Sequence, residues 1–108
     1  MTTAVTINDP ILDRFRQALR EIYGDRLQRV VLFGSRARGD AGPGSDYDVA
    51  VFLKSMDSRW SELNRLADLR VQFLDATGAF FDARPYPVSS YQDRSALMHE
   101  IRRHGIEL

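Results

Sequence analysis

The chain has 108 residues, of which 44% are hydrophobic and 28% charged, with 15 basic and 15 acidic side chains. This length and composition fit one globular domain over residues 1–108, and the balanced charge argues against stable binding of nucleic acid. The absence of cysteine excludes disulfides and thiolate metal sites. The start of the chain lacks the charged and apolar regions of a signal peptide, and no apolar run approaches the roughly 20 residues that span a bilayer. We therefore expect a cytoplasmic protein that does not associate with a membrane.

The first half of the chain predicts a helix, a strand and a loop. Asp9 is a suitable N-cap, a proline follows it at the first helical position, and apolar residues then recur at helical spacing until Gly24 ends the helix. The apolar run from Val30 to Phe33 is typical of a short buried strand. The segment 38–45 holds three glycines and one proline, which favour turns.

The second half predicts two more strands and two more helices. The run 47–53 is rich in valine and aromatic residues and indicates a strand, and helical spacing returns over 58–77 before Gly78 ends it. A short third strand is expected over 79–82, after which Pro85 and Pro87 interrupt pairing. Ser89 or Ser90 is expected to cap a last helix, which Gly105 closes.

These elements predict an α+β or α/β fold, in which a small mixed sheet of about three strands packs against three to four helices. The order helix–strand–strand–helix–strand–helix does not separate the two classes.

Two carboxylates stand at the start of the second strand. Asp46 and Asp48 are two residues apart, so on a strand they point to the same face with their Cα atoms roughly 6.6 Å apart. Carboxylate oxygens suit Mg²⁺ or Mn²⁺, and two bare carboxylates this close repel each other unless a cation lies between them. The pair is therefore a candidate metal site.

A Gly-Ser pair follows the first strand. Gly34 permits close approach of the backbone to a ligand, and the Ser35 hydroxyl can donate a hydrogen bond to a phosphate. A phosphate cradle beside a cation site is the arrangement that nucleotidyl transfer requires. Each fragment alone is more typical of ordinary turn chemistry, and it is their fixed spacing between two strands that favours the functional interpretation.

The stretch "GSRARGDAGPGSDYDVAVF" resembles the signature of the minimal nucleotidyltransferases, small members of the DNA polymerase beta-like superfamily. The resemblance extends loosely over the whole chain. It implies a nucleotidyltransferase fold, ATP as substrate, Gly34 and Ser35 at the triphosphate, and Asp46 and Asp48 as catalytic ligands of Mg²⁺ or Mn²⁺.

The same superfamily implies a third catalytic carboxylate on a neighbouring strand, which ligates metal and accepts the proton of the attacking hydroxyl. Asp82 is the candidate, and the alternative is a solvated carboxylate or one paired with Arg84. Arg36 and Arg38 flank the Gly-Ser pair, and since a guanidinium matches phosphate oxygens, Arg36 is a candidate nucleotide ligand. An ordinary loop arginine is the alternative for each.

The resemblance also implies a partner. Minimal nucleotidyltransferases are often paired with a HEPN-type ribonuclease toxin, so we expect an antitoxin that transfers AMP from ATP to a hydroxyl of that toxin, in particular a tyrosine, within an oligomer of the two. One alternative is an inactive antitoxin that neutralises the toxin by binding, which an exposed apolar patch would support. A second alternative is a transferase for small molecules of the aminoglycoside type.

Overall fold

The structure is a computed structural model that describes residues 9–42, 44–56 and 58–108. The sequence pattern at the start of the chain therefore lies outside the described residues, as does Pro43 in the predicted loop. In the part of the chain that is described, no helix is long and apolar enough to cross a membrane.

A mixed sheet with the strand order β3-β2-β1-β4 is the centre of the fold. Strands β1 (Leu27–Phe33) and β2 (Tyr47–Leu53) are antiparallel, and β2 pairs in parallel with β3 (Phe81–Pro87). The short β4 (Ile106–Glu107) pairs antiparallel with β1 on the other side. The predicted α+β architecture is confirmed, with one strand more than the sequence indicated.

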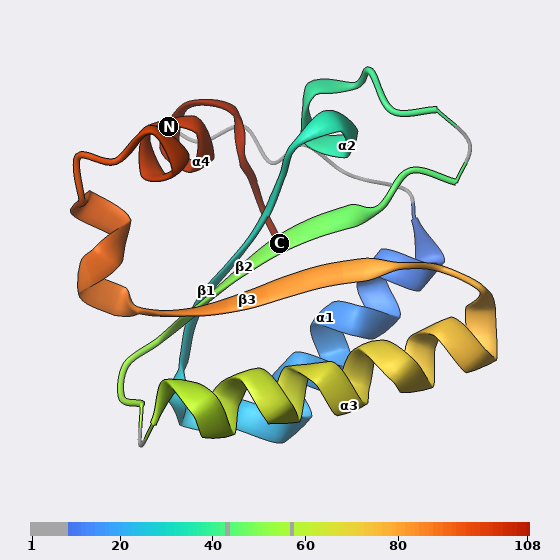
Figure 1. The fold of residues 1–108 in the computed structure, drawn as a ribbon, viewed down its shortest axis with the longest axis horizontal. Helices are drawn as coiled ribbons and strands as arrows, with labels where there is room; N and C mark the ends of the chain where they lie inside the picture. The colour runs from blue at the N-terminus through green and yellow to red at the C-terminus, as the bar shows by residue number, and fades with distance from the viewer. Residues whose placement is uncertain (1–8, 43, 57) are drawn as a thin grey trace.

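Helices cover both faces of this sheet (Figure 1). On one face, α1 (Pro10–Tyr23) and α3 (Arg59–Thr77) pack over the larger core cluster, which includes Phe15, Val49 and Phe81. On the other face, α4 (Ala96–His104) packs over a smaller cluster that includes Ala50 and Phe52. Residues of β2 therefore alternate between the α1/α3 face and the α4 face.

The predicted ends of the two long helices are confirmed. The Asp9 carboxylate accepts hydrogen bonds from the backbone N–H groups of Ile11 and Leu12 at 3.0 and 3.1 Å, and α1 ends at Gly24. The Ser58 hydroxyl caps α3, and Gly78 ends it in the left-handed conformation.

Two predictions for the elements are wrong. The third strand does not stop at Asp82 but continues through Pro85 and Pro87, because β3 lies at the edge of the sheet, where a missing N–H is tolerated. The last helix is capped by Ser95, whereas Ser89 and Ser90 lie in a short 3₁₀ helix, η2 (Val88–Gln92).

Candidate active site

Gly34 lies between the end of β1 and the short helix α2 (Ser35–Arg38), in a conformation with φ 75° and ψ −156° that essentially only glycine adopts. Its carbonyl oxygen accepts hydrogen bonds from the N–H groups of Ala37 and Arg38, both at 3.1 Å. A Cβ atom at Gly34 would lie 2.3 Å from Oδ2 of Asp48. The absence of a side chain here therefore lets the backbone after β1 touch the carboxylate of β2.

Strand register brings Asp48 and Asp82 side by side. Asp48 pairs with Phe33 of β1 on one side and with Asp82 of β3 on the other. Paired residues of neighbouring strands share a face of the sheet. Asp46 directly precedes β2, and its carboxylate is close enough to raise the pKa of Asp48. The three predicted acids thus lie at the end of the sheet where β1 ends and β2 and β3 begin.

The pKa of Asp48 reflects this crowding. Burial raises it above the ordinary carboxyl value of 3.8, and the carboxylates of Asp82 and Asp46 raise it further. Arg84 opposes the shift, while Glu100 adds to it. The site accordingly holds an excess of negative charge that a cation would neutralise.

Asp82 has a cationic partner in the structure. Arg84 lies two residues further along β3 and donates to both carboxylate oxygens of Asp82, from Nε at 3.3 Å and from Nη2 at 3.0 Å. This contact raises the pKa of Arg84. Asp82 is therefore both in register with Asp48, as a third carboxylate should be, and paired with Arg84, as the alternative interpretation held.

Glu100 of α4 is a neighbour of the site that sequence reasoning missed. Its carboxylate raises the pKa of Asp48. Its Oε1 lies 3.4 Å from Nη1 of Arg38, and Nε of the same arginine lies 3.3 Å from Oδ2 of Asp40. The contact ties α2 to α4 across the site. No local motif signals Glu100, because its place depends on how α4 packs on the sheet.

Arg36 does not turn toward the acids. Its Nε donates to the carbonyl oxygen of Ser45 at 2.9 Å, and its guanidinium carbon lies 3.9 Å from the centre of the Tyr47 ring. Tyr47 belongs to the α1/α3 face, opposite to Asp48. Burial and a hydrogen bond to Asp9 raise the pKa of Tyr47 to about 12, so the ring remains neutral beside the guanidinium.

Asp46 and Asp48 suit a magnesium or manganese ion. Mg²⁺ commonly takes one or two protein carboxylates and completes its shell with water and substrate phosphates. Among the described residues, no group of three acidic or histidine side chains is arranged to hold a metal ion as it stands. The negative charge around Asp48 is compatible with such an ion.

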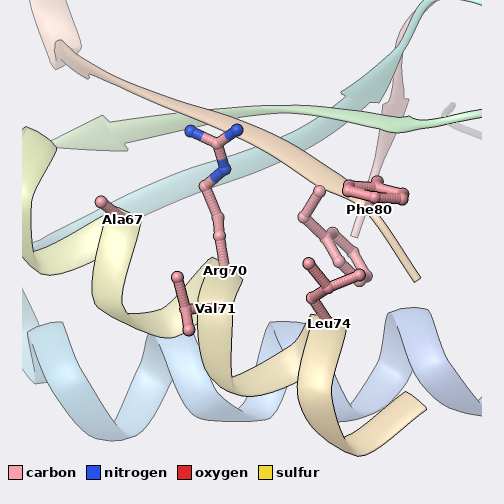
Figure 2. Close-up of a pocket in the computed structure, with 6 residues that line it drawn as sticks. Ala67, Arg70, Val71, Leu74 and Phe80 are labelled. Atoms are coloured by element: carbon pink, nitrogen blue, oxygen red, sulfur yellow. The ribbon is translucent and has the colours of Figure 1, made fainter. Parts of the chain in front are cut away.

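A cavity of about 290 Å³ lies between α3 and β3 (Figure 2). Side chains that are mostly apolar, Val71, Leu74 and Phe80 among them, gather around it together with Arg70. None of the predicted site residues lines it. The cavity is therefore separate from the acids.

Two curated relatives come from Methanocaldococcus jannaschii. The chain is 38% identical over 65 residues to the protein named "Putative protein adenylyltransferase MJ1305", which is 59% of this chain and 44% of that protein. It is 46% identical over 46 residues to "Putative protein adenylyltransferase MJ0141", which is 43% of this chain and 46% of that protein. The chain spans about half the length of the curated relatives that it matches.

Solved structures with a similar fold are toxin–antitoxin structures. One, crystallised with AMP-PNP, has a TM-score of 0.60 at 21% identity and covers 88% of this chain and 70% of its own. A mutant form of the MntA-HpeT toxin–antitoxin has a TM-score of 0.61 at 19% identity and covers 95% of this chain and 72% of its own. At this level of identity the likeness shows a shared fold.

The model of one protein family, the nucleotidyltransferase domain, matches residues 12–97. This span contains the whole sheet except β4, and with it Gly34 and all three predicted acids. The chain therefore belongs to the nucleotidyltransferase domain family.

Proposed function

We propose that this protein is a metal-dependent nucleotidyltransferase that moves AMP from ATP to a hydroxyl group, in particular a tyrosine, of a HEPN-type toxin, and acts as its antitoxin. The main observation behind the proposal is that Asp48 pairs in register with Asp82, at a place where Gly34 has no side chain to separate the backbone from the Asp48 carboxylate. The names of the curated relatives and the toxin–antitoxin structures of similar fold support the reaction and the partner.

Each site residue has a role in this proposal. Asp46 and Asp48 would hold the Mg²⁺ or Mn²⁺, which neutralises charge on the phosphates when it is bound. Gly34 lets the phosphates approach the backbone, and the Ser35 hydroxyl donates a hydrogen bond to them. These residues orient the α-phosphate toward the incoming hydroxyl.

The transfer also requires the hydroxyl group of the acceptor tyrosine to lose its proton. The tyrosine oxygen forms a bond to the α-phosphorus, the bond from that phosphorus to the bridging oxygen breaks, and pyrophosphate leaves. Asp82 accepts the proton of the tyrosine hydroxyl, for which it has to leave Arg84. The Arg84 contact is half-exposed and therefore weak enough to be exchanged.

The test uses ATP labelled at the α-phosphate, Mg²⁺ and the protein encoded beside this one. We expect label on the partner, lost in Asp46→Asn and Asp48→Asn and kept in Asp68→Asn, which changes an exposed carboxylate of α3. Since general acid–base catalysis contributes roughly 10²- to 10⁴-fold, Asp82→Asn should slow labelling by a factor in that range.

A second candidate function is neutralisation of the toxin by binding alone. Exposed apolar side chains favour it: Trp60 and Val71 of α3 are 71% and 57% exposed, and Phe80 is 55% exposed. Val71 and Phe80 border the cavity in Figure 2. If the partner is bound and inhibited equally well by wild type and by Asp46→Asn, with no transfer of label, the binding function replaces the enzymatic one.

A further inference from the structure

The side chain of Arg36 contacts both chain neighbours of Asp46. Its Nε donates to the Ser45 carbonyl at 2.9 Å, and its guanidinium carbon lies 3.9 Å from the Tyr47 ring centre. Arg36 itself belongs to α2, directly after the Gly-Ser pair. One side chain thus connects the predicted phosphate cradle to the residues before and after a predicted metal ligand.

The Tyr47 ring under Arg36 is held firmly. It is 5% exposed, and its hydroxyl donates to Oδ2 of Asp9 at 2.5 Å. It stacks on Phe81 at 4.5 Å, and Phe81 stacks on Phe15 at 3.9 Å. This aromatic column, formed by Tyr47, Phe81 and Phe15, extends from the site into the core and gives Arg36 a fixed support.

The hydrogen bond to Ser45 acts directly on Asp46. The carbonyl oxygen of Ser45 and the backbone nitrogen of Asp46 belong to one planar peptide group. When Arg36 fixes that oxygen, it fixes the orientation of the peptide plane from which Asp46 extends. Asp46 is exposed, so its backbone conformation is set more by these neighbours than by packing of its own side chain.

We propose that Arg36 is a positioning residue for Asp46, which it holds in the geometry that binds a divalent cation, and not a ligand of the nucleotide. This inference rests on the proposed metal site. A guanidinium that contacted phosphate on the α4 face would have to leave the Tyr47 ring, which belongs to the α1/α3 face, whereas Arg38 on the same helix already points toward Glu100 of α4.

The two roles predict opposite changes in affinity for a free cation. Removing a positive charge near the acids raises the affinity for Mn²⁺ if charge is all that Arg36 contributes. Loss of a positioning contact lowers it, and loss of such outer contacts typically costs 10- to 100-fold. Binding of Mn²⁺ in the absence of nucleotide, followed by electron paramagnetic resonance, separates the two.

We expect Arg36→Gln to weaken Mn²⁺ binding about ten-fold. Arg36→Lys keeps the charge but loses the directed Nε bond and the flat stacking, so it should weaken binding to a similar degree. The matched control is Arg38→Gln, which removes the same charge from the same short helix without touching Ser45 or Tyr47, and it should bind Mn²⁺ as tightly as wild type or more tightly. Thermal unfolding of each variant identifies the temperature at which all are folded, and affinities are compared there.

Each outcome decides between the proposals. If Arg36→Gln and Arg36→Lys bind Mn²⁺ as wild type does or better, the positioning role is overturned while the metal site stands. If wild type binds no Mn²⁺ either alone or with ATP, the proposed metal site fails and the role of Arg36 fails with it. Should Arg36→Gln not fold, Arg36→Lys, which retains the charge and the aliphatic stem, decides alone.

Discussion

At the scale of single residues, Gly34 and Gly39 allow a direct test of the contact with Asp48. Both have positive φ, 75° and 82°, but Gly34 has an extended ψ that essentially only glycine adopts, whereas Gly39 is left-handed with ψ 11°. A Cβ at Gly34 would strike the Asp48 carboxylate, and one at Gly39 would meet nothing within 4 Å.

We expect Gly34→Ala to lower the free energy of unfolding by about 3 kcal/mol and Gly39→Ala by about 1 kcal/mol, as measured by urea denaturation. Gly34→Ala should also abolish nucleotide transfer, because it displaces Asp48, whereas Gly39→Ala should retain it. Equal losses in the two variants would show that neither the contact with Asp48 nor the backbone conformation of Gly34 costs more than the left-handed conformation of Gly39.

Asp48 should reduce stability in the absence of metal. Because burial and the neighbouring acids raise its pKa above 3.8, the folded state binds the proton more tightly than the unfolded state does. The free energy of unfolding therefore falls as the pH rises from about 4 through the raised pKa. Above the raised pKa the folded protein carries the full cost of this charge.

We predict that Asp48→Asn melts at a higher temperature than wild type at pH 7 in the presence of a chelator, and that the difference vanishes at pH 4 and below. Asp75→Asn, on the exposed surface of α3, should change neither value. Added Mn²⁺ should stabilise wild type but not Asp48→Asn. A lower melting temperature for Asp48→Asn at pH 7 would contradict the sign of the shift.

Which site residues the sequence can predict depends on how local their arrangement is. Gly34, Asp46 and Asp48 were identifiable because a strand end and a spacing of two residues already specify their relation. The orientation of Arg36 depends on Tyr47 and Ser45 together, and the contact of Glu100 depends on the packing of α4. These contacts form between different helices and strands, so no single stretch of sequence predicts them.

At the scale of elements, β3 is an edge strand with a protected outer side. The N–H of Tyr47 donates to the carbonyl of Phe80 at 2.9 Å, and in a parallel ladder alternate residues face the neighbouring strand. The backbone groups of Phe81 and Ala83 therefore face the open edge, as do the ring nitrogens of Pro85 and Pro87. The two prolines offer no donor to a further strand, which is a common defence against pairing between molecules.

Replacing both prolines should expose this edge. Pro85→Val combined with Pro87→Val adds two outward N–H groups and two residues that favour strands. We expect increased self-association with rising concentration, measured by sedimentation velocity against wild type. Arg84→Val is the control, because it adds a similar side chain to a residue whose backbone already pairs with β2. Equal association of all three proteins would show that the prolines do not guard the edge.

Helix ends were more predictable than strand ends. Asp9, Gly24, Ser58 and Gly78 act within one turn of the helix that they end, so their type and position suffice. Ser89, Ser90 and Ser95 all precede α4. Ser95 is its N-cap, because Ser89 and Ser90 belong to η2. The strand β4 has two residues and exists through its pairing with Val31 and Leu32, which no local pattern announces.

At the scale of the whole molecule, the two faces of the sheet differ in what they contribute to the fold and to the candidate site. The α1/α3 face carries the larger core and the aromatic column, and the α4 face carries the acids. The order of elements along the chain indicated a small mixed sheet, but the strand order β3-β2-β1-β4 follows from tertiary pairing. The formal charge of zero likewise hides the local excess of negative charge around Asp48.

The parallel pairing of β2 with β3 also has a consequence for how the protein folds. Phe33 and Asp48 meet through an antiparallel connection, whereas Asp48 and Asp82 are separated by the whole of α3. Closing the longer loop costs more chain entropy, so contacts of this kind tend to form later. Asp46 and Asp48 are close together from the start, whereas Asp82 joins them only when β3 pairs with β2, so the repulsion between Asp48 and Asp82 is expected to arise late in folding.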